Sequence, residues 1–182
     1  NIYVKTMGET CEEVAGIYYN ISMLCEQMKN FEKALILAKK SIKIYETVLD
    51  TLNPKLGNSY KQVSDILTLT VSHENSLLYY ENALNVFNKR PVENDLAIAM
   101  VYTNIGYLFE IKKQYDKSIE LHENSNRILR NNINYGQQLG LSYFHLGHVN
   151  SLRGNYHLAD SFYKKSIAYT KDINNQITTI IN

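Results

Sequence analysis

Three histidines near the C-terminal end of the chain have the residue type and spacing that come closest to a metal-binding pattern. His145 and His148 lie three residues apart, which places both imidazoles on one face of a helix, and His157 follows in the next predicted helix. Imidazoles in such an arrangement can share a metal ion. No acidic or cysteine ligand accompanies the pair on its own helix. We therefore predict no metal site and no cofactor.

Other catalytic patterns are absent from the sequence. It contains no glycine-rich loop that would cradle a phosphate, no His-Glu-x-x-His helix, no paired Cys-x-x-Cys motifs and no nucleophile elbow. We therefore expect that this chain is not an enzyme.

Composition and charge exclude several classes of partner. The 182 residues are 45% hydrophobic and 20% charged, which is typical of a globular protein with a real core. The net charge of +1 gives no electrostatic reason to expect nucleic acid or an anionic membrane surface as a partner. No apolar run approaches the roughly 20 residues that cross a bilayer. We predict no nucleic-acid binding and no membrane association.

The two cysteines and the N-terminal residues bear on the cellular compartment. Cys11 and Cys25 lie fourteen residues apart in one predicted helix. At 1.5 Å per residue they are roughly 20 Å apart, too far to form a disulfide with each other. Free thiols suit a reducing compartment. The N-terminal stretch NIYVKTMGET shows no secretory leader, so we expect a cytoplasmic protein. Because the chain lacks an initiating Met, we expect it to be an excerpt of a longer one.

The elements that would position any site repeat along the chain. One column of the repeat is tyrosine every time, at Tyr18, Tyr60, Tyr102 and Tyr143, with spacings of 42, 42 and 41 residues. A small residue follows four positions later, at Ser22, Ser64, Gly106 and Gly147. A ring then recurs at Phe31, His73, Tyr115 and Tyr156, with small residues three and ten positions after it. These recurring columns indicate a repeat architecture in which small residues mark the close approach of helices.

Each repeat has the apolar spacing of two helices. In the third repeat Tyr102, Ile105 and Phe109 step by three and four residues, and a second amphipathic run begins at Tyr115. We expect very short turns within the pairs, at 28–30, 71–72, 112–114 and 154–155. Longer polar linkers join the pairs, and the prolines in Asn53-Pro54 and Arg90-Pro91 indicate where one helix stops and the next begins.

These columns resemble the tetratricopeptide repeat, and the 42-residue spacing most resembles the longer variant found in kinesin light chains. The resemblance covers about residues 10–171. It implies an all-α, right-handed α-solenoid of about four helix-turn-helix repeats, at 10–51, 55–92, 95–132 and 136–171, with the start of a fifth at 173–182. The whole chain, 1–182, would be a single array. In this fold the Tyr column is expected to be core, packed between helices.

The same resemblance implies where a ligand would bind. In such solenoids the first helix of each pair lines a concave groove, and in kinesin light chain-like repeats an Asn there hydrogen-bonds the main chain of a bound peptide. That position is Asn20, Gln62, Asn104 and His145 in the four repeats, a direct match at Asn20 and Asn104 only. We also expect the neighbouring inward residues Tyr19, Lys61, Tyr107 and Phe144 to contact the ligand. Only Lys61 matches a basic clamp for a terminal carboxylate, so we predict no carboxylate capture.

The resemblance leaves several functions open. The first hypothesis is a protein-interaction module that binds a peptide or partner segment in the groove. The second is a structural spacer that forms homo-oligomers through the array ends. The third is a regulatory or sensor arm of a larger signalling protein. RNA recognition is disfavoured, because the inner positions include Glu26, Asp65 and Glu110.

Overall fold

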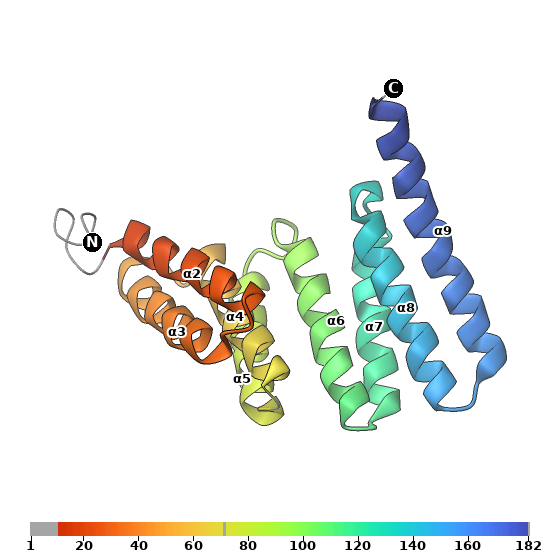
Figure 1. The fold of residues 1–182 in the computed structure, drawn as a ribbon, viewed down its shortest axis with the longest axis horizontal. Coiled ribbons are helices and arrows are strands. Elements are labelled where there is room, and N and C mark those ends of the chain that lie inside the picture. Colours follow the sequence, from red (N-terminus) through yellow and green to blue (C-terminus); the bar gives the residue numbers. More distant parts are fainter. Residues whose placement is uncertain (1–10, 71, 182) are drawn as a thin grey trace. The chain divides into compact units, whose positions relative to one another are not determined.

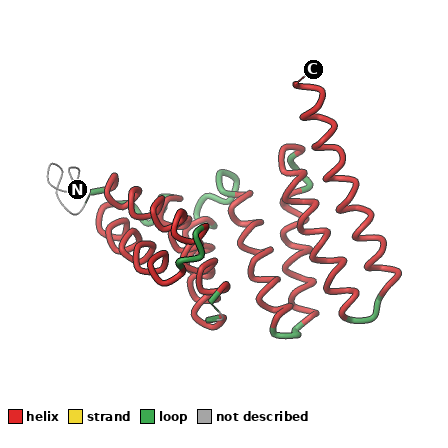
Figure 2. The backbone as a smooth tube through the Cα atoms, in the orientation of Figure 1, coloured by secondary structure: helices red, strands yellow, loops and turns green. Residues whose placement is uncertain are grey.

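The computed structural model describes the backbone of residues 11–70 and 72–181 and the side chains of 11–70 and 72–170. Every regular element within these ranges is helical, as Figures 1 and 2 show. The elements are α2 (Glu12–Gln27), α3 (Phe31–Val48), α4 (Pro54–Leu69), α5 (His73–Phe87), α6 (Asp95–Ile111), α7 (Tyr115–Leu129), the short 3₁₀ helix η1 (Ile133–Tyr135), α8 (Gly136–Leu152) and α9 (Tyr156–Ile181). The predicted all-α class and the four helical pairs are confirmed.

The chain divides into two compact units, of which unit 1 ends at Asn94 and unit 2 begins at Asp95. Unit 1 contains two antiparallel pairs, α2 with α3 and α4 with α5, and α3 packs against α4 to join them. Its core is made of small and branched apolar side chains. Ala15, Ala34, Ala38, Val63 and Ile66 have no exposed surface.

Unit 2 repeats this arrangement. The helix α6 pairs with α7, α8 pairs with α9, and α8 packs against both α7 and α6. Ala99, Leu129 and Leu139 form one of its buried clusters, and Tyr143 packs against this cluster from its margin. The contact of α6 with α8 brings side chains of two successive first helices together, which is the arrangement on which the candidate site depends.

The small residues of the repeat columns lie where the helices come closest. Ser22 and Ser64 on the first helices are fully buried, and so are Ala34 and Ser76 opposite them on the second helices. The Ser22 hydroxyl donates a hydrogen bond to the carbonyl oxygen of Ala34 at 2.8 Å, and Ser64 makes the same bond to Ser76. A hydroxyl that bonds to the facing backbone lets two helices approach without leaving a polar group unsatisfied. The packing role predicted for these columns is confirmed.

Three of the turns within the pairs share one backbone geometry. Lys29, Lys113 and Gly154 occupy the same place in three turns and have φ of 59°, 58° and 80°. In each turn the next residue donates a backbone hydrogen bond to the carbonyl five positions earlier, for example Asn30 to Cys25 at 2.8 Å. This is the Schellman C-cap, which usually takes glycine in the left-handed position. Two of the turns hold a lysine there instead.

The helix boundaries follow the sequence signals with one exception. Pro54 is the first residue of α4, and the Asn53 side chain caps that helix by accepting from the Lys55 amide at 3.0 Å. The expected start of a fifth repeat at 173–182 is not a separate helix, because α9 continues unbroken from Tyr156 to Ile181. The prediction was wrong because residues 171–181 contain no glycine or proline to end the preceding helix.

Two predicted features fall partly outside the described residues: Val71 of the second turn, and Asn182 of the fifth repeat. None of the helices in the described part of the chain combines the length and apolar character needed to cross a bilayer.

Candidate functional site

In unit 1 the structure brings Tyr19 and Asn20 to an open pocket. The pocket has a volume of about 310 Å³, and Tyr45, Lys55 and Asn58 line it as well. Asn20 is exposed and Tyr19 is half-buried. Burial raises the pKa of the Tyr19 phenol, with Lys61 acting in the opposite direction, so the hydroxyl stays protonated and can donate a hydrogen bond at neutral pH. An exposed amide beside a phenol offers both donors and acceptors to a polar ligand.

The other two predicted residues of unit 1 are engaged inside the unit. Gln62 is only 6% exposed, and its amide donates to a Glu26 carboxylate oxygen at 2.5 Å. The Lys61 ammonium lies 2.6 Å from Asp65 on the same helix. Because that carboxylate already neutralises it, Lys61 is not available as a free cation for a ligand carboxylate.

In unit 2 the predicted residues form an aromatic surface on the first helices. Tyr107 on α6 is 41% exposed and Phe144 on α8 is 46% exposed. The half-buried His145 ring lies between them, with ring centroids 5.9 Å from Tyr107 and 5.7 Å from Phe144. Asn104 is half-buried on α6. Neighbouring exposed aromatic rings are a common feature of protein-binding surfaces.

The four tyrosines of the repeat column pack against the helices as expected. Tyr18, Tyr60, Tyr102 and Tyr143 are all half-buried. The Tyr60 hydroxyl donates to Glu46 at 2.6 Å, and Tyr143 stacks on Phe162 and Tyr169. An apolar ring packed inward with a polar tip at the surface is a structural role.

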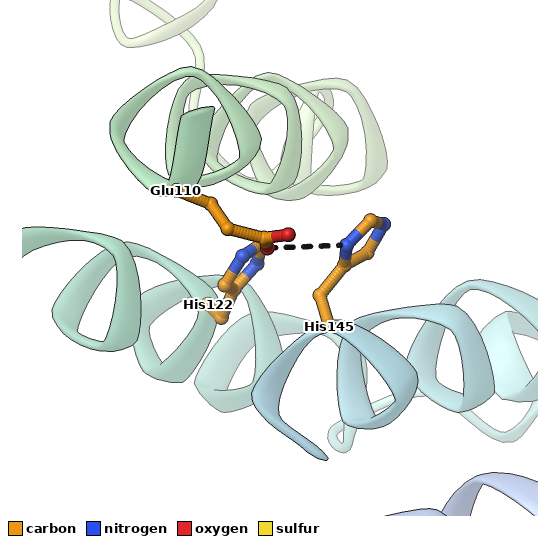
Figure 3. A group of neighbouring side chains, drawn as sticks. All are labelled: Glu110, His122 and His145. Carbon is orange, nitrogen blue, oxygen red and sulfur yellow. Dashed lines mark ion pairs between the residues drawn. The ribbon is translucent and has the colours of Figure 1, made fainter. Parts of the chain in front are cut away.

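A cluster of titratable groups lies directly beneath the aromatic surface of unit 2. Figure 3 shows Glu110 of α6, His122 of α7 and His145 of α8 converging on one point. One ligand atom from each residue lies within 4.8 Å of the others. The Nδ1 atom of His145 is 3.9 Å from Oε2 of Glu110, and Nδ1 of His148 is 2.5 Å from the other carboxylate oxygen.

His122 is the innermost member of this cluster. Its side chain has no exposed surface, and neither ring nitrogen has a hydrogen-bond partner among the described residues. Burial, and then the neighbouring His145, lower the pKa of His122 to about 3, so the ring is neutral at physiological pH. Each unsatisfied buried donor or acceptor costs about 1–3 kcal/mol. The protein therefore carries an energetic cost to keep this imidazole in place.

Local packing fixes the position of the His122 ring. A Cβ on Gly106 would lie 2.8 Å from it, so the absence of a side chain there makes room for the imidazole. The ring stacks on His145 at a centroid distance of 5.0 Å and an interplanar angle of 5°. The Ser142 hydroxyl also donates to the His122 backbone carbonyl at 3.2 Å. These contacts hold the imidazole between α6 and α8.

The sequence alone suggested a different set of histidines. His157 is exposed on α9 and is not part of the cluster. Glu110 and His122 take part instead, and both are buried. The missing acidic ligand comes from Glu110, which is 38 residues before His148 in sequence. Aligning the repeats in register would have indicated that α6 faces α8 here.

Comparison with known proteins connects this chain to one repeat family. A model of the tetratricopeptide repeat matches residues 15–48 and 141–173, which cover the first and fourth helical pairs. Protein KINESIN LIGHT CHAIN-RELATED 1 of Arabidopsis thaliana is 23% identical over 158 residues, which represent 81% of this chain and 26% of the relative. The chain thus spans only about a quarter of that relative's length.

Solved structures share the fold at low sequence identity. BtubC (BKLC) from P. vanneervenii has a TM-score of 0.83 and 19% identity, covering 95% of this chain and 70% of that one. The apo form of RapI also has a TM-score of 0.83, with 18% identity over 98% of this chain and 62% of that one. Two of the four helical pairs thus match the tetratricopeptide repeat, and the chain as a whole is similar in fold to BtubC and in sequence to a kinesin light chain-related protein.

Proposed function

We propose that this chain is a protein-protein interaction module that binds an extended segment of a partner protein along its first helices. The observation that carries the proposal is the exposed aromatic pair of unit 2, Tyr107 and Phe144, on two successive first helices. Large aromatic side chains supply much of the binding energy in protein interfaces because they bury a large area at little cost in conformational entropy.

Each unit also carries polar groups on its first helices that suit such a ligand. The exposed amide of Asn20 can donate to and accept from a peptide bond, which needs both functions at once. The half-buried amide of Asn104 holds the equivalent place in unit 2. Lys61 is paired with Asp65, so this surface favours apolar and uncharged peptide side chains over a free carboxylate terminus.

Selection of peptides on the immobilised chain, followed by affinity measurements, tests this proposal. Peptides from a displayed random library are enriched, and the Kd of a selected peptide is measured by fluorescence anisotropy for the wild type and for Tyr107→Ala and Phe144→Ala. We expect each variant to weaken binding by about tenfold or more, as truncation of an interface anchor does. Asn20→Ala is expected to have a smaller effect, since it removes hydrogen bonds at an exposed site.

The matched control is Asn85→Ala on α5, an exposed asparagine on a second helix of unit 1. It should leave the Kd unchanged. Equal affinity of the wild type and both aromatic variants for every selected peptide would contradict the proposal.

Two further sequence-based hypotheses stay as predictions. If the chain self-associates through the array ends, the molar mass measured by light scattering should rise with protein concentration. A regulatory arm of a larger protein predicts that a second domain is encoded beside this chain. We further expect a cytoplasmic location and no enzymatic activity.

A further inference from the structure

We propose that Glu110, His122 and His145 form a binding site for a divalent transition-metal ion of the zinc class. The three side chains come from three helices of unit 2, α6, α7 and α8, and converge on one point (Figure 3). Two imidazole nitrogens and one carboxylate oxygen are a ligand set that zinc takes in many proteins. The proposal is independent of the peptide-binding function.

The spacing of the ligand atoms is close to that of a metal site. The three atoms lie within 4.8 Å of one another in the absence of an ion. Ligands about 2.1 Å from a tetrahedral ion are separated by about 3.4 Å. Closing this gap requires the His145 side chain to turn out of its stack with His122 until Nδ1 points at the ion, and His145, which is 17% exposed, is the least confined of the three.

The unsatisfied polar atoms also point to a ligand. Eight buried side-chain nitrogen and oxygen atoms in the described residues lack a hydrogen-bond partner, and four of them belong to this cluster. The four are Glu110 Oε2, both ring nitrogens of His122 and Nδ1 of His145. A cation at the centre would accept a lone pair from each of the three side chains. No other part of the described chain concentrates such groups in this way.

His148 has the position of a supporting residue. Its Nδ1 atom is 2.5 Å from Oε1 of Glu110, whereas His145 is near the other carboxylate oxygen, Oε2. A donated hydrogen bond there orients the carboxylate and leaves Oε2 for the ion. Ligating carboxylates are commonly held by such outer contacts.

The ligand set selects among cations. Imidazole nitrogen favours Zn²⁺, Co²⁺ and Ni²⁺, whereas Ca²⁺ and Mg²⁺ require oxygen ligands, of which this site offers one residue. A water molecule can complete the coordination on the partly exposed His145 side. A bound ion would connect the two helical pairs of unit 2 directly beneath Tyr107 and Phe144, and so stiffen the surface that they form.

The test is metal binding by the chain after treatment with a chelator. Isothermal titration with ZnCl₂ at pH 7.5 is expected to show one ion per chain, and thermal unfolding should shift to higher temperature with Zn²⁺. Titration with CoCl₂ should produce visible absorption bands of a low-symmetry nitrogen and oxygen site. Glu110→Gln, His145→Gln and His122→Phe should each weaken zinc binding by about tenfold or more.

The variants are chosen so that the fold survives. Gln occupies the position of His145 in the second repeat, as Gln62, and rings occupy the position of His122 in the second and fourth repeats, as Tyr80 and Tyr163. Circular dichroism checks folding. His157→Gln, an exposed histidine outside the cluster, is the matched control and should bind zinc as the wild type does. Absence of a stoichiometric zinc site in the wild type, or equal zinc affinity in folded cluster variants and the wild type, would overturn the proposal.

Discussion

The same four positions of the helical repeat hold different chemistry in the two units. In unit 2 these positions are Glu110, His122, His145 and His148; shifted back by two repeats, they are Glu26, Ala38, Gln62 and Asp65 in unit 1. In unit 1 the Gln62 amide donates directly to the Glu26 carboxylate at 2.5 Å. In unit 2 the corresponding atoms of His145 and Glu110 are 3.9 Å apart. One scaffold thus carries a closed polar pair in unit 1 and an open cluster in unit 2.

Only the glutamate is shared by the two units, and the other three of the four positions differ. Ala38 is fully buried and leaves no polar group in the core of unit 1, whereas His122 brings two unsatisfied nitrogens into the core of unit 2. Asp65 in unit 1 is held by Lys61 and by the Tyr80 hydroxyl, each at 2.6 Å. At these four positions unit 1 therefore satisfies its polar groups internally, and unit 2 has groups that remain available to a ligand.

The largest expected loss of stability follows from removing the hydrogen bond between Gln62 and Glu26 in unit 1. Gln62→Leu removes the amide that donates to Glu26 and leaves a carboxylate in a half-buried position. A hydrogen bond to a charged group contributes about 1.5–3 kcal/mol, so we expect the free energy of unfolding to fall by about that amount. Urea unfolding followed by circular dichroism measures it.

The matched variant in unit 2 is His145→Leu in metal-free protein. Glu110 keeps its contact with His148 at 2.5 Å, and His145 is 3.9 Å from the carboxylate, so we expect a loss below about 1 kcal/mol. If both variants lost the same free energy, the distinction between a closed pair and an open cluster would fail.

Most of the helical scaffold could be predicted from the sequence, because the same contacts between helices recur in each helical pair. Tyr18 recurs as tyrosine, and Ser22 and Ala34 recur as small residues, every 41 or 42 residues, and the small residues are buried as the repeat pattern predicts. Pro54 indicated the start of α4 because its ring is compatible only with the first turn of a helix. The end of α9 was not predictable in this way, since the sequence after the fourth repeat lacks a signal that stops a helix.

The candidate metal site was not predictable from short-range spacing. Glu110 and His122 lie 12 residues apart on different helices, and His145 is 23 residues further on. Only tertiary packing brings them within 4.8 Å. The sequence drew attention to His145 and His148, which are three residues apart, and to His157 on the next helix, but it predicted no metal site, and His157 is exposed on α9. Peptide-contact residues such as Asn20 and Tyr107 were proposed from a family resemblance, and they stay predictions until a ligand is found.

A substitution at Gly106 tests how tightly unit 2 confines the His122 ring. Gly106→Ala would place a methyl group 2.8 Å from a ring that has no exposed surface. Overpacking of this kind costs about 1–3 kcal/mol, and the higher helix propensity of alanine offsets about 1 kcal/mol of it. We therefore expect a net loss of up to about 2 kcal/mol in the free energy of unfolding.

The control for this substitution lies in unit 1. A Cβ on Gly16 would be 3.4 Å from the Tyr45 hydroxyl, which is close to ordinary contact. Gly16→Ala should therefore stabilise the protein by up to about 1 kcal/mol through helix propensity alone. A stabilising Gly106→Ala variant would show that the His122 ring is not held in place, and the cluster geometry would lose its support.

The smallest effect concerns a feature that the two units share. Lys29 in unit 1 and Lys113 in unit 2 have φ of 59° and 58°, a left-handed conformation that costs a residue with a Cβ about 1 kcal/mol. Lys29→Gly and Lys113→Gly should each raise the free energy of unfolding by about 0.5–1 kcal/mol, since some of the gain is lost to the greater entropy of glycine in the unfolded chain. Gly154→Lys, at the same turn position, should lower the free energy of unfolding by a similar amount.

Equal gains in the free energy of unfolding from the two lysine-to-glycine substitutions would mean that the turns of the two units have the same energetics. The units would then differ only in the polar groups that the scaffold carries. Clearly unequal gains, measured by urea unfolding under the same conditions, would instead place part of the difference between the units in the helical turns.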